Sequence, residues 1–183
     1  AVATKAFYEK LVAWAKTYEV GVVSDLAYGA LGYQGYENPS FLSTPGAKDV
    51  GIEFYTFSKT FNMAGWRLAF AAGNEQMIEA LNLIQDHLFV GIFPALQEAG
   101  IAALLDPKSE EAVAQLNATY DSRRDAFVQA AAKIGWKAFP SKGSFYAWMP
   151  VPEGYTSESF ADLLLEKAHV AVAPGKGFGP AGD

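Results

Sequence analysis

The spacing of apolar residues predicts that the first part of the chain alternates helices with strands. A period of about 3.6 residues indicates helices over residues 4–18, 74–89 and 93–105. Short apolar or β-branched runs at residues 21–23, 52–57 and 68–72 indicate strands, and the first of these has the composition of a buried parallel strand. This alternation predicts an α/β fold.

The pattern changes after about residue 105. A long helix is expected from about residue 108 to residue 134, where Gly135 ends it. Its apolar stripe is assigned to core packing and consists of Val113, Leu116, Tyr120, Phe127 and Ile134. Residues 136–139 and 144–149 are predicted to form a hairpin, Ser157 or Glu158 to begin a last helix, and residues 170–173 to form a short strand. We therefore expect one domain over residues 1–105 and a smaller one over residues 106–183.

Composition and charge exclude several classes of function. The chain carries 14 basic and 20 acidic residues, and its net charge of −6 argues against a nucleic-acid partner. It has no cysteine, which excludes disulfides and thiolate chemistry, and its two histidines argue against a histidine-centred metal site. No apolar run is long enough to span a membrane, and no secretion signal is visible, although a preceding segment could carry one. We expect a cytoplasmic protein.

Lys59 lies in the segment with the most distinctive chemistry. It follows a predicted strand, has Phe57, Phe61 and Trp66 around it in the sequence, and precedes Arg67 by eight residues. Desolvation lowers the pKa of an amine and makes it a better nucleophile toward an aldehyde. A guanidinium fork suits a phosphate dianion. Two surface charges would show the same spacing, but an amine that can form a Schiff base near a phosphate clamp suggests pyridoxal 5′-phosphate (PLP).

Asp25 and Tyr28 follow the first predicted strand, at the end where open α/β sheets place their ligands. A carboxylate against the pyridine nitrogen of PLP keeps the ring protonated, so that the ring can accept electrons. A phenol near the ring's 3-oxygen tunes the imine that the lysine forms. The alternative is that Asp25 caps a turn and that Tyr28 is a half-buried packing residue.

Together these motifs resemble the PLP-dependent aminotransferases of fold type I, class I/II. The resemblance rests on Asp25-x-x-Tyr28, Thr56-x-x-Lys59 and Gly65-x-Arg67, and it extends over essentially all 183 residues. It implies part of the large-domain sheet with its helices, followed by a smaller α+β C-terminal domain. Complete members of the family are longer, so we interpret the chain as a central-to-C-terminal fragment that is inactive alone.

The resemblance also implies a role for each motif residue. Asp25 would hold the pyridine nitrogen, Tyr28 the 3-oxygen, and Lys59 the cofactor as a Schiff base while it also carries protons. Arg67 would bind the phosphate, together with a hydroxyl three residues before the lysine that is usually serine and is threonine here. The residues assigned to the cofactor are Asp25, Tyr28, Thr56, Ser58, Lys59 and Arg67.

Gly143-Ser144-Phe145 resembles the family's Gly-x-Phe, which would make Phe145 part of the substrate pocket; ordinary small-domain packing is an equal alternative. The implied reaction transfers an amino group between an amino acid and a 2-oxo acid, and a homodimer is expected. A different PLP reaction, such as carbon–sulfur β-lyase or acyltransfer chemistry, is the nearest rival. The alternative from another functional class is that the chain is a catalytically silent domain, a folded piece that no longer holds the cofactor.

Overall fold

The computed structural model describes residues 2–139 and 141–183, and the chain divides into two compact units. Unit 1 consists of Ala1–Phe127 and Pro140–Tyr146, and unit 2 of Val128–Phe139 and Ala147–Asp183. The long helix α6, Ser109–Lys133, belongs to unit 1 for most of its length and ends in unit 2. The domain boundary expected after residue 105 stays a prediction.

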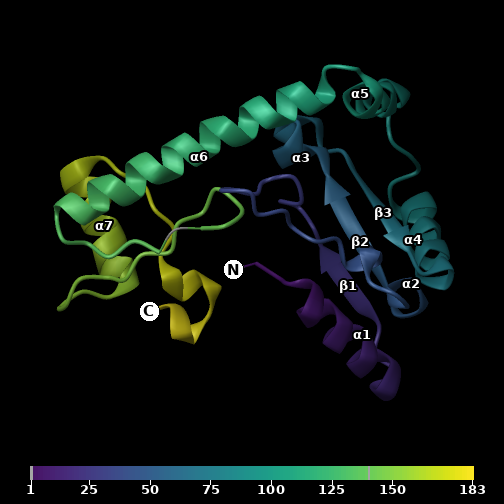
Figure 1. Ribbon diagram of the computed structural model, residues 1–183, viewed down its shortest axis with the longest axis horizontal. Helices are drawn as coiled ribbons and strands as arrows, with labels where there is room; N and C mark the ends of the chain where they lie inside the picture. The colour runs from purple at the N-terminus through teal and green to yellow at the C-terminus, as the bar shows by residue number, and fades with distance from the viewer. Residues whose placement is uncertain (1, 140) are drawn as a thin grey trace. The chain divides into compact units, whose positions relative to one another are not determined.

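A three-stranded sheet in unit 1 carries the predicted alternation of elements. It has the order β1 (Val22–Asp25), β2 (Gly51–Thr56) and β3 (Ala69–Gly73), as Figure 1 shows. β1 pairs parallel to β2, and β2 pairs antiparallel to β3. The three predicted strands and the parallel direction of the first are confirmed. The expectation that β1 is buried is wrong, because β1 lies at one edge of this sheet and its Val23 is 62% exposed.

The core of unit 1 lies where the first helix meets the segment before β2. Helix α1, Lys5–Tyr18, begins at the predicted position, where the Thr4 hydroxyl accepts a hydrogen bond from the Phe7 amide. The buried cluster consists of Tyr8, Val12, Phe41 and Ala47. Phe41 and Ala47 come from a 3₁₀ turn, Phe41–Ser43, and from the short helix α2, Ala47–Val50. This packing holds α1 against the polypeptide that leads into β2.

The two longer helices after β3 begin and end where the sequence predicts, whereas the short helix directly after β2 was not predicted. Short α3, Phe57–Thr60, follows β2, and a 3₁₀ turn, Ala64–Trp66, precedes β3. The side chain of Asn74 caps α4, Glu75–Leu88, and Pro94 opens α5, Pro94–Leu105. Gly135, at φ 73°, follows α6 in a left-handed conformation that glycine adopts without strain. None of the described helices has both the length and the apolar stretch that a membrane crossing requires.

The apolar stripe of α6 is not the core face that we expected. Ala131 is the buried residue of this helix, whereas Phe127 is 42% exposed and Ile134, just beyond the helix, is 75% exposed. Val113, Leu116 and Tyr120 are half-buried. A periodic stripe shows which face of a helix can be covered, but burial requires a neighbouring element over that face.

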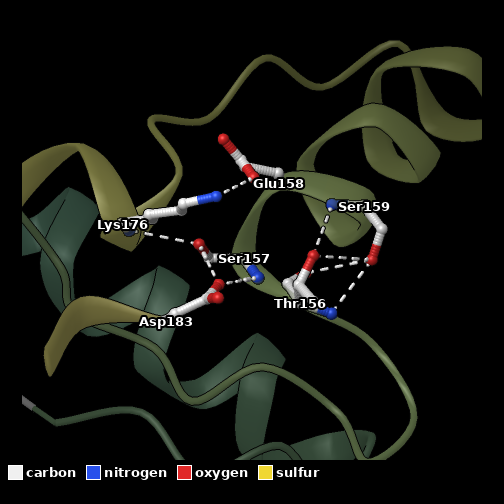
Figure 2. A network of polar contacts seen from close by, with 6 residues as sticks. All are labelled: Thr156, Ser157, Glu158, Ser159, Lys176 and Asp183. Atoms are coloured by element: carbon white, nitrogen blue, oxygen red, sulfur yellow. Dashed lines mark hydrogen bonds and ion pairs between the residues drawn. The ribbon is translucent and has the colours of Figure 1, made fainter. Parts of the chain in front are cut away.

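Unit 2 is built around α7, Ser157–Ala168, which begins at the predicted residue with a capping box of Thr156 and Ser159. Figure 2 shows how the last turns of the chain bind this helix end: Asp183 accepts hydrogen bonds from the amide and hydroxyl of Ser157, both at 2.8 Å. These bonds lower the pKa of the Asp183 carboxyl. In the same figure Lys176 pairs with Glu158 at 2.7 Å. The helix is thereby fixed to residues far along the chain.

The strands predicted beyond α6 are absent from the described part of the chain. Residues 136–139, 144–149 and 170–173 form no strand, and Pro140, in the predicted hairpin turn, lies outside the described residues. An isolated two-stranded hairpin is marginal in water, because most of its backbone bonds need further strands beside it. Instead, Gly143 forms a single bridge to Gly32, and both residues belong to unit 1.

Candidate functional site

The predicted site residues meet at one edge of the sheet. Because β1 and β2 are parallel, their carboxyl ends lie at the same edge, where open α/β sheets bind their ligands. Asp25 is the last residue of β1 and pairs with Phe54 of β2. Lys59 lies in α3, directly after β2, and the Thr56 hydroxyl caps that helix by accepting from the Ser58 amide at 3.2 Å. The carboxylate and the amine therefore come to one edge from segments far apart in the sequence.

Aromatic rings from distant segments surround the amine of Lys59. Its Nζ lies 5.8 Å from the ring centroid of Tyr28 and 5.1 Å from that of Phe145. The two rings meet edge to face with centroids 5.3 Å apart. Such contacts attract an ammonium group to the ring faces. Phe145 thus lies beside the lysine, and its place in a substrate pocket stays a prediction.

The neighbouring aromatic residues in the sequence pack differently. Phe57 is buried and packs against Phe61, with ring centroids 5.6 Å apart, while Trp66 is 47% exposed. The rings found beside Nζ are thus those of Tyr28 and Phe145, which lie before and after the motif in the sequence. The hydrophobic surroundings that we expected for Lys59 exist, but tertiary packing supplies them.

Asp25 and Tyr28 line a cavity of about 160 Å³ together with Asn38, Gly143 and Ser144. Asn38 shapes this wall, since its Nδ2 donates to the carbonyls of Tyr28 at 3.0 Å and of Leu31 at 2.9 Å. A Cβ atom added at Gly143 would lie 2.9 Å from the Leu31 oxygen and 3.0 Å from the Asn38 side chain. Glycine at this position lets the two walls approach each other.

Burial raises the pKa of the Tyr28 phenol, and the neighbouring Tyr146 and Asp25 raise it further. Removing a proton from this hydroxyl would create a second negative charge next to the Asp25 carboxylate in partly desolvated surroundings. The phenol therefore stays neutral at physiological pH. A neutral phenol can donate a hydrogen bond to an anionic oxygen.

Two hydroxyl groups and a guanidinium complete the predicted set. The Thr56 hydroxyl donates to that of Ser58 at 2.9 Å, so these two groups lie together after β2. Arg67 has a left-handed backbone, φ 52°, and its side chain is exposed, with Nη1 donating to the Ala64 carbonyl at 3.1 Å. Arg67 uses one of its five donors in its own turn and leaves others for an anion. The structure thus brings Asp25, Tyr28, Lys59 and Phe145 together and places Thr56 with Ser58, whereas Arg67 contacts its own turn.

Three residues of the site were not predicted from the sequence. Tyr146 lies with its ring 5.9 Å from that of Tyr28, and Tyr8 and Asn38 line the same cavity. The position of Tyr146 directly after Phe145 was an available signal. Tyr8 and Asn38 gave none, because only the packing of α1 and of the loop after β1 brings them to the cavity.

Comparison with known proteins gives a consistent result. The family described as aminotransferase class I and II matches residues 1–182. The chain is 57% identical over 183 residues to an L-glutamine–4-(methylsulfanyl)-2-oxobutanoate aminotransferase of Bacillus subtilis, and 47% identical over 183 residues to an LL-diaminopimelate aminotransferase of Moorella thermoacetica. These alignments cover 100% of this chain and 46% of each relative.

Solved structures agree. The substrate-bound structure of BacF from Bacillus subtilis superposes with a TM-score of 0.94 at 48% identity, and this match covers 99% of the chain and 46% of BacF. The chain therefore spans about half the length of the proteins that it matches.

Proposed function

The chain belongs to the class I and II aminotransferase family, and from this premise we propose that the protein containing it transfers an amino group between an amino acid and a 2-oxo acid. The cofactor of that reaction is PLP. One observation carries the proposal: the Lys59 amine lies beside the Tyr28 and Phe145 rings, at the sheet edge where Asp25 ends β1. An amine, a phenol and a carboxylate at one edge form the set of groups that this chemistry needs.

The residues present fit the cofactor. When bound, PLP supplies an aldehyde for an amine and a ring that accepts electrons. Lys59 would hold it covalently through Nζ, and Asp25 would face its pyridine nitrogen. The hydroxyls of Thr56 and Ser58, which lie 2.9 Å apart, and the free donors of Arg67 would hold its phosphate.

Asp25 acts in this proposal as a fixed negative charge. Its carboxylate is exposed at the end of β1, and within the described residues no helix or turn uses it as a cap. Among the described residues, the Asp25 carboxylate therefore has no helix or turn that it caps, which argues against a purely structural role. A preorganised carboxylate at this position keeps a proton on a facing ring nitrogen.

Lys59 and Tyr28 divide the proton chemistry between them. With PLP bound, the Lys59 amine would be the base that takes the proton from the substrate α-carbon. Tyr28, kept neutral by burial, would donate a hydrogen bond to the ring's 3-oxygen. The Phe145 ring, whose centroid lies 5.1 Å from the amine, would shield one side of it from water.

A homodimer and a cytoplasmic location are parts of the same proposal. The segment between α4 and α5 exposes a run of large apolar residues: Leu88, Phe89, Val90 and Phe93 are 70%, 71%, 86% and 68% exposed. An apolar run of this kind supports an interface with another surface. The net charge of −6 and the lack of cysteine suit the reducing cytoplasm.

The named relatives favour transamination over the rival PLP reactions. Both curated relatives described above are named aminotransferases, and neither is named a lyase or an acyltransferase. The substrates in the names of these two relatives differ, so we propose the reaction class and leave the amino acid open.

The covalent role of Lys59 provides the test. The whole protein, loaded with PLP, is reduced with borohydride and mapped by mass spectrometry, and its turnover is assayed with pairs of amino acids and 2-oxo acids. We expect the label on Lys59 and its loss in Lys59→Ala, with the exposed Lys48→Ala as the matched control. Label on Lys48 or Lys142 with Lys59 unmodified would contradict the assignment. The 183-residue chain tested alone is expected to show no turnover.

A further inference from the structure

One face of α6 contacts both segments that carry the rings beside Lys59. Asn117, Tyr120, Asp121 and Arg124 recur at intervals of three and four residues, so they lie along one side of the helix. We call these four residues the α6 brace. The two segments are residues 28–36, which carry Tyr28, and residues 141–146, which carry Phe145.

The brace holds the first segment at two points. The Asn117 Nδ2 donates to the Ala30 carbonyl at 2.6 Å. The guanidinium of Arg124 lies over the ring of Tyr33, 5.0 Å from its centroid. Tyr33 is only 2% exposed, so this cation–π contact is shielded from water and is stronger than a surface contact.

The brace also holds the second segment. Arg124 Nη1 donates to the Ser141 carbonyl at 3.3 Å, and Tyr120 stacks on Phe145 with centroids 5.4 Å apart. The two segments bond to each other as well: the Tyr33 amide donates to the Lys142 carbonyl at 3.0 Å. Arg124 is thus the brace residue whose guanidinium touches both segments.

The guanidinium of Arg124 is held firmly in this position. It pairs with Asp121 at 2.7 Å and with Asp125 at 2.5 Å, and its side chain is 10% exposed. The planar guanidinium is thus surrounded by the two carboxylates, the Tyr33 ring and the Ser141 carbonyl. A guanidinium can bond in several directions within its plane while stacking on a ring, which a lysine ammonium cannot do.

We propose that Arg124 is a positioning residue that holds the Tyr28 and Phe145 rings against the Lys59 amine. The inference rests on the proposed function, since it assigns a task at the same site. Arg124 acts through Tyr33 and Ser141 and touches neither the lysine nor the ring pair. Without the Arg124 side chain, Lys59 stays in α3 and Asp25 stays in β1. The two segments can then shift, and the pocket wall that they form shifts with them.

The test uses the whole PLP-loaded protein with Arg124→Met, Arg124→Lys and, as the matched control, Lys133→Met at an exposed position near the end of the same helix. We expect Arg124→Met to lower kcat/KM by about 10- to 100-fold, the loss that small displacements of a positioned group cause. The kcat/KM of Arg124→Lys should lie between that of Arg124→Met and that of the wild type. Lys133→Met should stay within about twofold of the wild type, as surface substitutions usually do.

Two further readouts separate positioning from general stability. The pH midpoint of the absorbance of the bound cofactor should move in Arg124→Met in the same direction as in Tyr28→Phe, because both variants weaken the same phenol contact. In a double-mutant cycle with Phe145→Ala, the two losses in kcat/KM should be far from additive, since one residue acts through the other. A lower melting temperature with an unchanged midpoint and additive losses would overturn the inference.

The outcomes also distinguish this inference from the proposed function. A wild-type protein that neither binds PLP at Lys59 nor transaminates refutes the proposed function. An active wild type with wild-type behaviour in Arg124→Met refutes the role of Arg124 alone. If Arg124→Met does not fold, Arg124→Lys decides, and a wild-type midpoint together with a wild-type kcat/KM in that variant overturns the proposal.

Discussion

Replacing Glu53 by leucine is expected to loosen the loop that forms one wall of the cavity. Glu53 is 7% exposed, and its carboxylate accepts three hydrogen bonds. The Ser24 hydroxyl at 3.0 Å and the Phe41 amide at 2.7 Å donate to one oxygen, and the Ser40 hydroxyl at 2.6 Å donates to the other. This single side chain therefore ties β1 and the loop after Asn38 to β2.

The expected cost follows from what each donor loses. The Phe41 N–H is a fixed and buried backbone donor, and leaving it unpaired costs about 1–3 kcal/mol. The two serine hydroxyls can turn toward other acceptors, so each loses about 0.5–1.5 kcal/mol. Relief of the carboxylate's desolvation offsets part of this loss, which leaves about 2–4 kcal/mol. Glu53→Gln should lose less, because it keeps one acceptor oxygen while giving up charge-assisted bonds.

Hydrogen exchange at the Phe41 amide measures this loss directly. A loss of about 2–4 kcal/mol corresponds to roughly 30- to 1,000-fold faster exchange in Glu53→Leu. Glu79→Leu, at an exposed position of α4, is the matched control and should leave this amide unchanged. The reasoning fails if Glu53→Leu exchanges at the wild-type rate, or if Glu53→Gln exchanges as fast as Glu53→Leu.

Two other predictions concern the site. In the whole enzyme, Asp25→Asn should lower kcat by about 10²- to 10³-fold and Asp25→Glu by less, as for other preorganised electrostatic groups; a near-wild-type rate for Asp25→Asn in a steady-state assay would make Asp25 merely structural. Burial raises the pKa of Tyr8, Tyr28 and Tyr33, so their neutral forms stabilise the fold below the unfolded-state pKa of about 10, and that stability is lost as the pH rises above it. Melting temperatures measured across this range should fall less steeply in Tyr28→Phe than in the exposed Tyr18→Phe, and equal slopes would refute the argument.

Local sequence signals correctly predicted where helices begin and end. Thr4, Asn74 and Thr156 bind the first turns of their helices through their own side chains, and Gly135 ends α6 because its backbone adopts φ 73° without strain. These interactions join residues at most a few positions apart, so adjacent residues encode them completely. The close sequence spacing from Thr56 to Lys59 led to the proposed site in the same way.

The tertiary structure alone decided which faces are buried and which residues meet. Val23 and Phe127 are apolar residues of the kind found in cores, but both are exposed. Residues 136–139 form no strand. Burial and strand pairing both depend on elements that lie elsewhere in the chain. Phe145 reaches Lys59 from 86 positions away, and Glu53 and Arg124 gain their roles only from partners in other segments. The residue types and their spacing thus determined the family and the groups proposed to react, whereas long-range packing determined the walls around those groups.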